Sequence, residues 1–202
     1  MADPIEFYFD FSSPYGYLAS ERVEAVAERH GREVVWRPIL LGAIFKATGG
    51  APLIEAPLKG EYSFMDFARS AREHGIAFAR PTRFPLGAVA AKRAVMHVRA
   101  DASTSDRTAD LVHAIYRAYY ADDVDISAPD AVLDLAAGIG LDRDAIAAAL
   151  GDQAVKDALR QEVEGALARG VFGSPTMALG DELFWGHDRV DMLDRWLERG
   201  GW

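Results

Sequence analysis

The stretch that most constrains the fold is a buried strand that runs directly into a helix near the N-terminus. Aromatic and branched residues from Ile5 to Phe11 predict the strand, and the pattern changes at Ser12-Ser13-Pro14 to that of an amphipathic helix. Proline suits the first helical position because its missing N–H would be unpaired there in any case. Ser13 is then the predicted N-cap of the helix.

This turn between strand and helix presents a hydroxyl and backbone N–H groups to whatever lies above it. An anion at that point would be stabilised by the positive end of the helix dipole, by roughly 0.3 to 1 kcal/mol at an exposed site. A serine-proline pair before a helix can equally be a cap and nothing more. The stretch alone therefore leaves an anion site and a simple cap open.

Composition restricts the class of protein and its partners. The chain has 202 residues, of which 50% are hydrophobic and 26% are charged, as expected of a globular protein with a substantial core. The formal net charge of −9 argues against nucleic acid and against an anionic membrane as partners. No apolar run is long enough to span a membrane, and the first residues lack the features of a signal peptide, so we expect a cytoplasmic protein.

The chain contains no cysteine. This absence excludes disulfides, thiolate metal ligands and a cysteine nucleophile, and with them a disulfide oxidoreductase. The five histidines form no pair with metal-binding spacing, and no glycine-rich nucleotide motif occurs, so neither a metal nor a nucleotide cofactor is predicted. Any thiol chemistry would have to use a borrowed thiol.

The remaining pattern predicts a strand–helix–strand unit, a helical block and a hairpin. Residues 33–38 predict a second strand, and a right-handed crossover then places the N-terminus of the first helix at the carboxyl ends of two parallel strands. Residues 39–57 combine a short helical pattern with a loop of glycine and proline residues, which is typical of a mobile cover. Residues 171–186 predict a hairpin that turns at Gly180-Asp181. Helices are predicted at residues 14–31, 41–48, 62–75, 86–99, 105–121, 129–138, 142–150, 152–169 and, capped by His187 or Asp188, at the C-terminus.

Several side chains in the middle of the chain have two interpretations. Lys59 precedes a predicted helix, where a lone lysine is ordinarily solvated. Arg80 and Arg83 lie in the apolar, proline-containing segment 76–85, where they could meet a carboxylate substrate, although exposed arginines need no such explanation. The tyrosines near residues 116–120 end an apolar helical stripe and could be core or the wall of a pocket.

Four motifs, in this order, resemble those of one family. They are Phe-Asp-Phe-Ser-Ser-Pro-Tyr-Gly-Tyr-Leu-Ala at residues 9–19, Arg-Pro-Ile-Leu-Leu-Gly at 37–42, Val-Phe-Gly-Ser-Pro-Thr at 171–176 and Phe-Trp-Gly-His-Asp-Arg at 184–189. Together they are similar to 2-hydroxychromene-2-carboxylate isomerase and its relative, the kappa-class glutathione transferase. The resemblance implies an α/β thioredoxin-like fold of the DsbA type, formed by residues 1–40 and 152–202, with a helical domain of residues 41–151 inserted.

The resemblance also implies that glutathione is the cofactor that supplies the missing thiol. Ser13 would be the catalytic residue, because its hydroxyl would donate to the glutathione sulfur while the helix dipole favours the thiolate. Ser12 is its neighbour in the chain and could be taken for the catalytic serine. Ser13 is favoured for that role because it directly precedes Pro14. The proline matching Pro175 is cis in relatives, and Ser174 before it would exchange backbone hydrogen bonds with the cysteinyl part of glutathione.

Three further residues are implied to hold the ends of glutathione. The Asp188 side chain would hold the γ-glutamyl ammonium, the N–H groups of His187 and Asp188 its carboxylate, and Lys59 the glycyl carboxylate. Relatives often have asparagine in place of Gly50 and serine or asparagine in place of His187, so contacts from those side chains cannot be carried over. In the isomerase an asparagine commonly follows the Phe-Pro pair, whereas Leu86-Gly87 follows here.

The expected function is a glutathione-dependent isomerase of 2-hydroxychromene-2-carboxylate or a similar intermediate of aromatic degradation. Arg80, Arg83 and Phe84 are the expected substrate-binding residues. One alternative is a kappa-like transferase that conjugates glutathione to electrophiles. A further alternative is a non-catalytic glutathione-binding module. Relatives often form dimers, so a homodimer is also compatible with the resemblance, although no sequence feature marks an interface.

Overall fold

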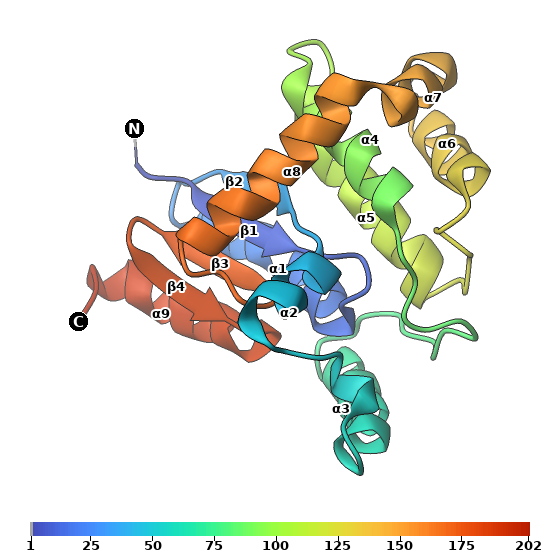
Figure 1. Cartoon of the computed structure of the whole chain (residues 1–202). Helices are drawn as coiled ribbons and strands as arrows, with labels where there is room; N and C mark the ends of the chain where they lie inside the picture. Colours follow the sequence, from blue (N-terminus) through green and yellow to red (C-terminus); the bar gives the residue numbers. More distant parts are fainter. Residues whose placement is uncertain (1) are drawn as a thin grey trace.

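A mixed four-stranded sheet occupies the centre of the molecule, as the computed structural model of residues 2–202 shows (Figure 1). Its order is β2-β1-β3-β4. Strand β1 is parallel to β2 and antiparallel to β3, which is antiparallel to β4. The strands are β1 (Ile5–Phe9), β2 (Val34–Pro38), β3 (Thr176–Leu179) and β4 (Glu182–Trp185). This confirms the α/β thioredoxin arrangement, with a parallel pair at one edge and the C-terminal hairpin at the other.

The first strand is shorter than the sequence predicts. β1 ends at Phe9, and Asp10 and Phe11 already belong to the turn that leads into α1. The turn forms because the N–H of Ser13 donates to the carbonyl oxygen of Asp10 at 2.9 Å. Apolar side chains alone suggested a longer strand, since Phe11 is buried like a strand residue although it lies in the turn.

Nine α-helices within residues 2–202 complete the fold. They are α1 (Pro14–Arg29), α2 (Leu41–Thr48), α3 (Lys59–Glu73), α4 (Val89–Ala100), α5 (Thr108–Tyr120), α6 (Pro129–Gly138), α7 (Arg143–Gly151), α8 (Gln153–Ala168) and α9 (Val190–Arg199). Short 3-10 turns occur at η1 (Leu53–Glu55), η2 (Ser105–Arg107) and η3 (His187–Arg189). None of these helices combines the length and the apolar composition needed to cross a membrane.

Every predicted helix is present, but three begin three residues away from the predicted position, and α7 and α8 each begin one residue later. α3 begins at Lys59 instead of residue 62, α4 begins at Val89 instead of residue 86, and η2 precedes α5 where one continuous helix was predicted. Periodicity locates the buried face of a helix, whereas its ends depend on local caps and on packing. Asp142 and Asp152, which were counted as the first residues of two predicted helices, instead cap α7 and α8 with their side chains.

Each face of the sheet has its own apolar core. Phe7 and Phe9 of β1 belong to the larger core, with residues of α1, α4, α5 and α9. Tyr8 points to the opposite face and packs in a smaller cluster with Val163 of α8 and Ile44 of α2. Figure 1 shows α8 crossing that face of the sheet. The alternation along a single strand therefore decides which helices lie on which face.

The central helices share the larger core with the sheet. Ala91 of α4 and Tyr116 of α5 lie in the same buried cluster as Phe7 and Phe9. The rings of Phe9 and Tyr116 are 5.9 Å apart between centroids. Packing is therefore continuous across the predicted domain boundaries at residues 41 and 151. The division of the chain into two domains stays a prediction.

Charged groups fix α1 against α5. His113 Nε2 lies 2.5 Å from Glu24 Oε2 and its Nδ1 lies 3.4 Å from Glu21 Oε1, while Arg117 donates to both oxygens of Glu21. Burial alone would lower the pKa of His113, but hydrogen bonds to the two glutamates outweigh it and raise that pKa to about 9. Burial alone would raise the pKa of Glu21, but hydrogen bonds from His113 and Arg117 lower it to about 2.

This cluster predicts a loss of stability in mild alkali. Because the pKa of His113 is raised in the folded chain, to about 9, the charged ring stabilises the fold fully below its ordinary pKa near 6.5, and the contribution disappears as pH rises through about 9. Urea denaturation should show the free energy of unfolding falling by roughly 1 to 3 kcal/mol more, between about pH 6 and 9.5, in the native chain than in His113→Gln. His97→Gln, a change on α4, serves as the control. Equal pH dependence in all three chains would contradict this role.

Candidate functional site

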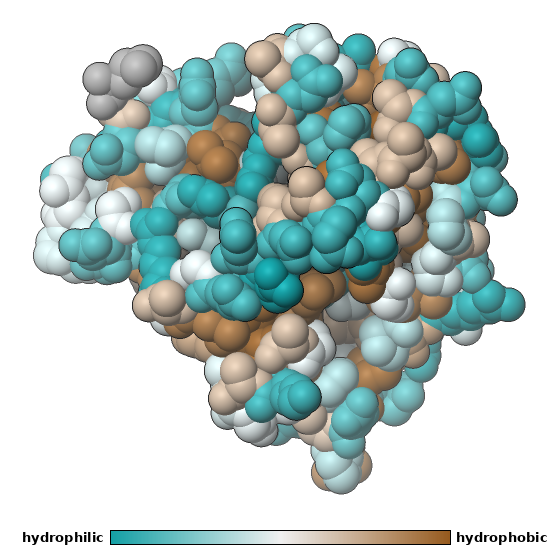
Figure 2. All heavy atoms as spheres, turned by 45° about the horizontal axis from the view of Figure 1, so that its top comes forward, coloured by the Kyte–Doolittle hydropathy of each residue, from teal (hydrophilic) through white to brown (hydrophobic). Residues whose placement is uncertain are grey.

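A cavity of about 760 Å³ opens where the β1–α1 turn meets α2 and α4. In the space-filling view, hydrophobic surface gathers above the lobe formed by α3 (Figure 2). Polar atoms at the cavity come from Asp10, Ser12, Ser13, Lys92 and Ser174. The apolar walls include Leu41, Phe45, Leu53, Ile54, Phe84, Leu86, Phe172 and Trp185. The cavity can therefore hold a mostly apolar ligand with a few fixed polar contacts.

Ser13 lies in this cavity as the N-cap of α1, which confirms the predicted cap. Its Oγ accepts a hydrogen bond from the N–H of Gly16 at 3.0 Å and donates to the carbonyl oxygen of Ser174 at 2.8 Å. The hydroxyl of Ser12 instead donates to Asp10 Oδ1 at 2.9 Å. Of the two adjacent serines, Ser13 thus has the hydroxyl at the helix N-terminus, where a ligand anion would be stabilised.

Ser174 and Pro175 come from the other end of the chain and face Ser13. The peptide bond between them is cis, as the resemblance implied, and a second cis bond that was not predicted joins Phe84 to Pro85. The Ser174 hydroxyl accepts from the backbone N–H of Asp10 at 3.0 Å. The carbonyl and side chain of Ser174 are thus both tied to the β1–α1 turn, so the structure brings Ser13 and Ser174 together.

Asp10 and Lys92 form an ion pair that the sequence analysis missed. Lys92 Nζ lies 2.7 Å from Asp10 Oδ1, and each side chain is only 3% exposed. The sequence contains a signal for this pair, because Lys92 lies on the apolar stripe of α4 with the buried Ala91 and Val95. A lysine on a buried helical face needs a charged partner, and Asp10 directly follows a buried strand.

Two buried tyrosines of α5 support the same turn. Tyr116 donates to the carbonyl oxygen of Asp10 and Tyr120 to that of Phe11, each at 3.0 Å. Both side chains have no exposed surface, and burial raises the pKa of each phenol well above its ordinary value. Of the two interpretations of these tyrosines, the structure supports the core, where their hydroxyls hold the backbone of the site.

His187 and Asp188 adjoin the cavity through Tyr15. The ring of His187, in η3, stacks on the ring of Tyr15, with centroids 4.7 Å apart and an angle of 5° between planes. Burial lowers the pKa of His187, which favours the neutral form of this ring. Asp188 is exposed and pairs with Arg189 at 2.6 Å. Neither residue lines the cavity itself; both lie beside it, at the N-terminal end of α9.

Lys59 lies at the first position of α3 and is exposed. It forms no ion pair with the residues that the structure describes. Tyr15 connects α3 to the site, because its hydroxyl donates to Asp66 Oδ2 at 2.6 Å. The expected contact of Lys59 with a glycyl carboxylate remains a prediction.

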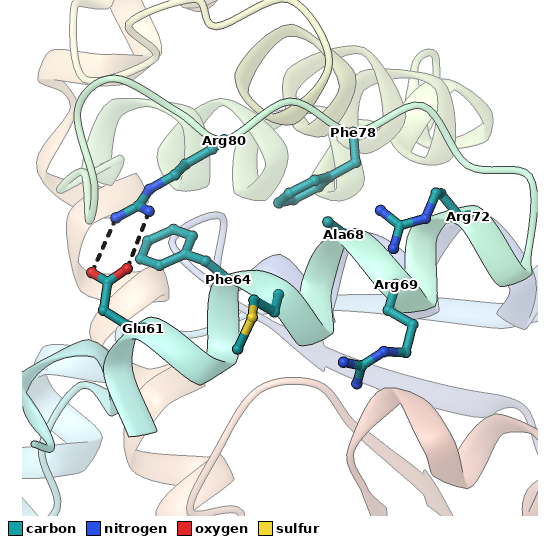
Figure 3. Close-up of a pocket in the computed structure, with 8 residues that line it drawn as sticks. Glu61, Phe64, Ala68, Arg69, Arg72, Phe78 and Arg80 are labelled. Atoms are coloured by element: carbon teal, nitrogen blue, oxygen red, sulfur yellow. Dashed lines mark hydrogen bonds and ion pairs between the residues drawn. The ribbon is translucent and has the colours of Figure 1, made fainter. Parts of the chain in front are cut away.

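Of the three expected substrate residues, Phe84 alone lines the cavity with Ser13. Arg80 lies in a separate surface hollow of about 530 Å³, formed by α3 and the segment after it (Figure 3). Its guanidinium covers the ring of Phe64 at 3.7 Å and pairs with Glu61 at 3.4 Å. Arg83 pairs with Asp125 at 2.5 Å on the surface. The structure therefore does not bring the two arginines into the cavity.

Comparison with known proteins agrees with this geometry. The model of the DSBA-like thioredoxin domain matches residues 4–198. A 2-hydroxychromene-2-carboxylate isomerase of Sphingobium xenophagum is 30% identical over 199 residues, which cover 98% of this chain and 99% of that protein. The chain belongs to the 2-hydroxychromene-2-carboxylate isomerase family. This family lies within the DSBA-like thioredoxin domains, and the recognition made from the four motifs is confirmed.

Other relatives of the isomerase family extend the comparison. The isomerase of Pseudomonas putida is 29% identical, over 96% of this chain and 94% of that protein. A solved structure of 2-hydroxychromene-2-carboxylate isomerase superposes with a TM-score of 0.86 at 27% identity, covering 96% of this chain and 94% of that chain. Glutathione S-transferase kappa 2 of Caenorhabditis elegans is 24% identical over 92% of this chain and 83% of that protein.

The packing around Ser13 predicts that no side chain larger than hydrogen fits at Gly16. A Cβ there would lie 2.5 Å from the Tyr116 hydroxyl and 3.1 Å from Ser174 Oγ, and Tyr116 is wholly buried. Gly16→Ala should lower the free energy of unfolding by roughly 1 to 3 kcal/mol, measured by urea denaturation. Gly165→Ala is the matched control, since that helical glycine of α8 has open space around it, and alanine there should stabilise by up to about 1 kcal/mol. Equal effects of the two changes would contradict the close packing at Gly16.

Proposed function

We propose that this protein is a glutathione-dependent isomerase of 2-hydroxychromene-2-carboxylate or a similar intermediate of aromatic degradation. The observation that carries the proposal is the Ser13 hydroxyl, which lies at the N-terminus of a sixteen-residue helix, inside a cavity, in a chain without cysteine. A thiol-dependent reaction on this fold would need a thiol from outside. Relatives named as isomerases and kappa transferases support glutathione as its source.

The residues at the cavity fit a bound thiolate. The Ser13 hydroxyl can turn from the carbonyl oxygen of Ser174, which it now reaches at 2.8 Å, to a sulfur above the helix N-terminus. There it would donate a hydrogen bond to the sulfur while the dipole of α1 favours negative charge, so both effects lower the pKa of a thiol. Bound glutathione would supply a nucleophile that adds reversibly to the conjugated substrate and so allows rotation about a former double bond.

The remainder of glutathione would be held by residues around the cavity. The backbone of Ser174, released from Ser13, would bind the cysteinyl part as an added strand does. The Asp188 side chain would hold the γ-glutamyl ammonium, and the N–H groups of His187 and Asp188 its carboxylate. Lys59, which is exposed at the start of α3, would reach the glycyl carboxylate.

The second substrate would lie against the apolar walls of the same cavity. Phe84 and Leu86 come from the segment before α4, and Phe45 from α2. Aromatic and aliphatic walls exclude water from a flat ring and hold it by its faces. A volume of about 760 Å³ falls in the range of sites for small organic molecules.

Conjugation is the second candidate function, and the kappa-class relative favours it. A transferase would use the same Ser13 but release glutathione joined to an electrophile. Mass spectrometry of the product separates the two reactions, because isomerisation leaves the substrate mass unchanged and transfer adds glutathione. Binding of glutathione in calorimetry, without turnover of chromenes or electrophiles, would instead indicate a binding module. A homodimer and a cytoplasmic location remain predictions.

Ser13→Ala should lower glutathione-dependent kcat/KM roughly 100-fold. The assay follows the ultraviolet spectrum of 2-hydroxychromene-2-carboxylate with and without glutathione. Thiolate absorbance near 240 nm should also show a higher pKa for the bound thiol, because the hydrogen bond from Ser13 is lost. The variant loses its N-cap as well, at a cost of about 1 kcal/mol in unfolding free energy, which denaturation measures separately.

Ser12→Ala is the matched comparison. The hydroxyl of Ser12 donates to Asp10, at 2.9 Å, and not toward the helix N-terminus. We therefore expect the pKa of the bound thiol to stay as in the native protein. Native kinetics and thiol pKa in Ser13→Ala would eliminate the proposed role of Ser13. Absence of any glutathione-dependent change in the native protein would eliminate the isomerase.

A further inference from the structure

We propose that Lys92 binds the carboxylate of the second substrate at the floor of the cavity. The inference rests on the proposed function, because it assigns a ligand class, a flat aromatic or chromene-like monocarboxylate, to the same site. Asp10 and Lys92 are the only charged residues among those of residues 2–202 that line the cavity. A ligand anion inside it therefore has one cation available, and that cation is the ammonium group of Lys92.

The hydrogen bonding of the buried pair is unequal. The Asp10 carboxylate accepts hydrogen bonds from the N–H and hydroxyl of Ser12 and from the N–H of Leu41 at 2.8 Å, and it forms the ion pair with Lys92. An ammonium group has three donors, yet Asp10 is the one acceptor that Lys92 Nζ contacts within residues 2–202. Asp10 is thus fully bonded by the protein, and Lys92 is not.

Burial limits which acceptors can reach the ammonium group of Lys92. The Lys92 side chain is only 3% exposed, so bulk water does not surround its ammonium group. Buried charges are stable when their remaining donors find acceptors. A ligand carboxylate provides two oxygens for such donors, and charge-assisted hydrogen bonds are about twice as strong as neutral ones. A ligand carboxylate in the cavity can therefore use the donors of Lys92 that Asp10 does not use.

The other candidates for this contact lie elsewhere. Arg80 and Arg83 pair with Glu61 and Asp125 outside the cavity. The Ser13 hydroxyl faces Ser174, and together with the helix N-terminus it is suited to the sulfur. Lys92 enters from α4, beside the apolar wall that would hold the ring, so it can meet a carboxylate attached to that ring.

The test compares two inert ligands of nearly equal shape, chromone-2-carboxylate and chromone-2-carboxamide. Their Kd values are measured by calorimetry with S-methylglutathione present, so that no thiol reaction occurs. The native protein should bind the carboxylate roughly 10- to 100-fold more tightly than the amide. Lys92→Met should remove this preference and leave the Kd of the amide within about twofold. Lys46→Met, an exposed lysine of α2 that does not line the cavity, should retain the full preference.

Two results would overturn the inference. One is a native protein that binds both ligands equally, and the other is a Lys92→Met variant that keeps the preference. In the second case, a raised pKa of the bound glutathione thiol would show that Lys92 faces the sulfur instead. Lys92→Met leaves the buried Asp10 carboxylate without its cation, which can prevent folding. If the single variant does not fold, the double variant Asp10→Asn/Lys92→Met is used in its place. The Kd of the amide then reports whether the cavity is intact.

Turnover of the native protein is measured separately and keeps the two proposals distinct. If the carboxylate preference depends on Lys92 but no chromene is isomerised, the carboxylate site stands and the proposed function is wrong. If isomerisation occurs and the preference survives Lys92→Met, the proposed function stands and the role of Lys92 is wrong.

Discussion

The cavity depends above all on the buried carboxylate of Asp10. It receives hydrogen bonds or an ion pair from the β1–α1 turn, from the first residue of α2 and from Lys92 of α4. Its backbone is held by Ser174 on one side and Tyr116 on the other. Three walls of the cavity and the cis-proline segment thus meet at one residue. Removing one partner of such a buried pair costs several kcal/mol, because the other charge stays buried without compensation.

This arrangement places the Ser13 hydroxyl, and no strongly nucleophilic side chain, at the N-terminal end of α1. Ser13 is a good cap and a weak nucleophile, and the cavity beside it is walled by apolar residues. A DSBA-like thioredoxin domain without cysteine keeps the position where a thiolate would be stabilised but lacks the thiol. In the proposed function, this site would activate a bound thiol, and its selectivity would rest on the walls contributed by the helical segment.

The sequence predicted much of the fold because its local signals agree with one another. The Ser13 cap, the strand–helix–strand unit and the hairpin turning at Gly180-Asp181 all follow from short-range chemistry, and each is present. By contrast, Arg80 and Arg83, which were expected to bind the substrate, do not line the cavity. Both lie in a segment that looks like the lining of a cleft, but where a side chain points along an extended chain depends on its partners, here Glu61 and Asp125.

The sequence by itself determined that Ser13 opens a helix, that no cysteine is present and that four motifs belong to one family. Tertiary structure alone decided that Lys92 meets Asp10 and that, of the three expected substrate residues, Phe84 lines the cavity whereas Arg80 and Arg83 do not. The physical reason is the separation along the chain over which each interaction acts. Capping and periodicity act within one turn of helix or a few residues of strand. The ion pair joins residues far apart in the chain, and only packing of α4 against the sheet brings their charges together in a place where water cannot compensate them.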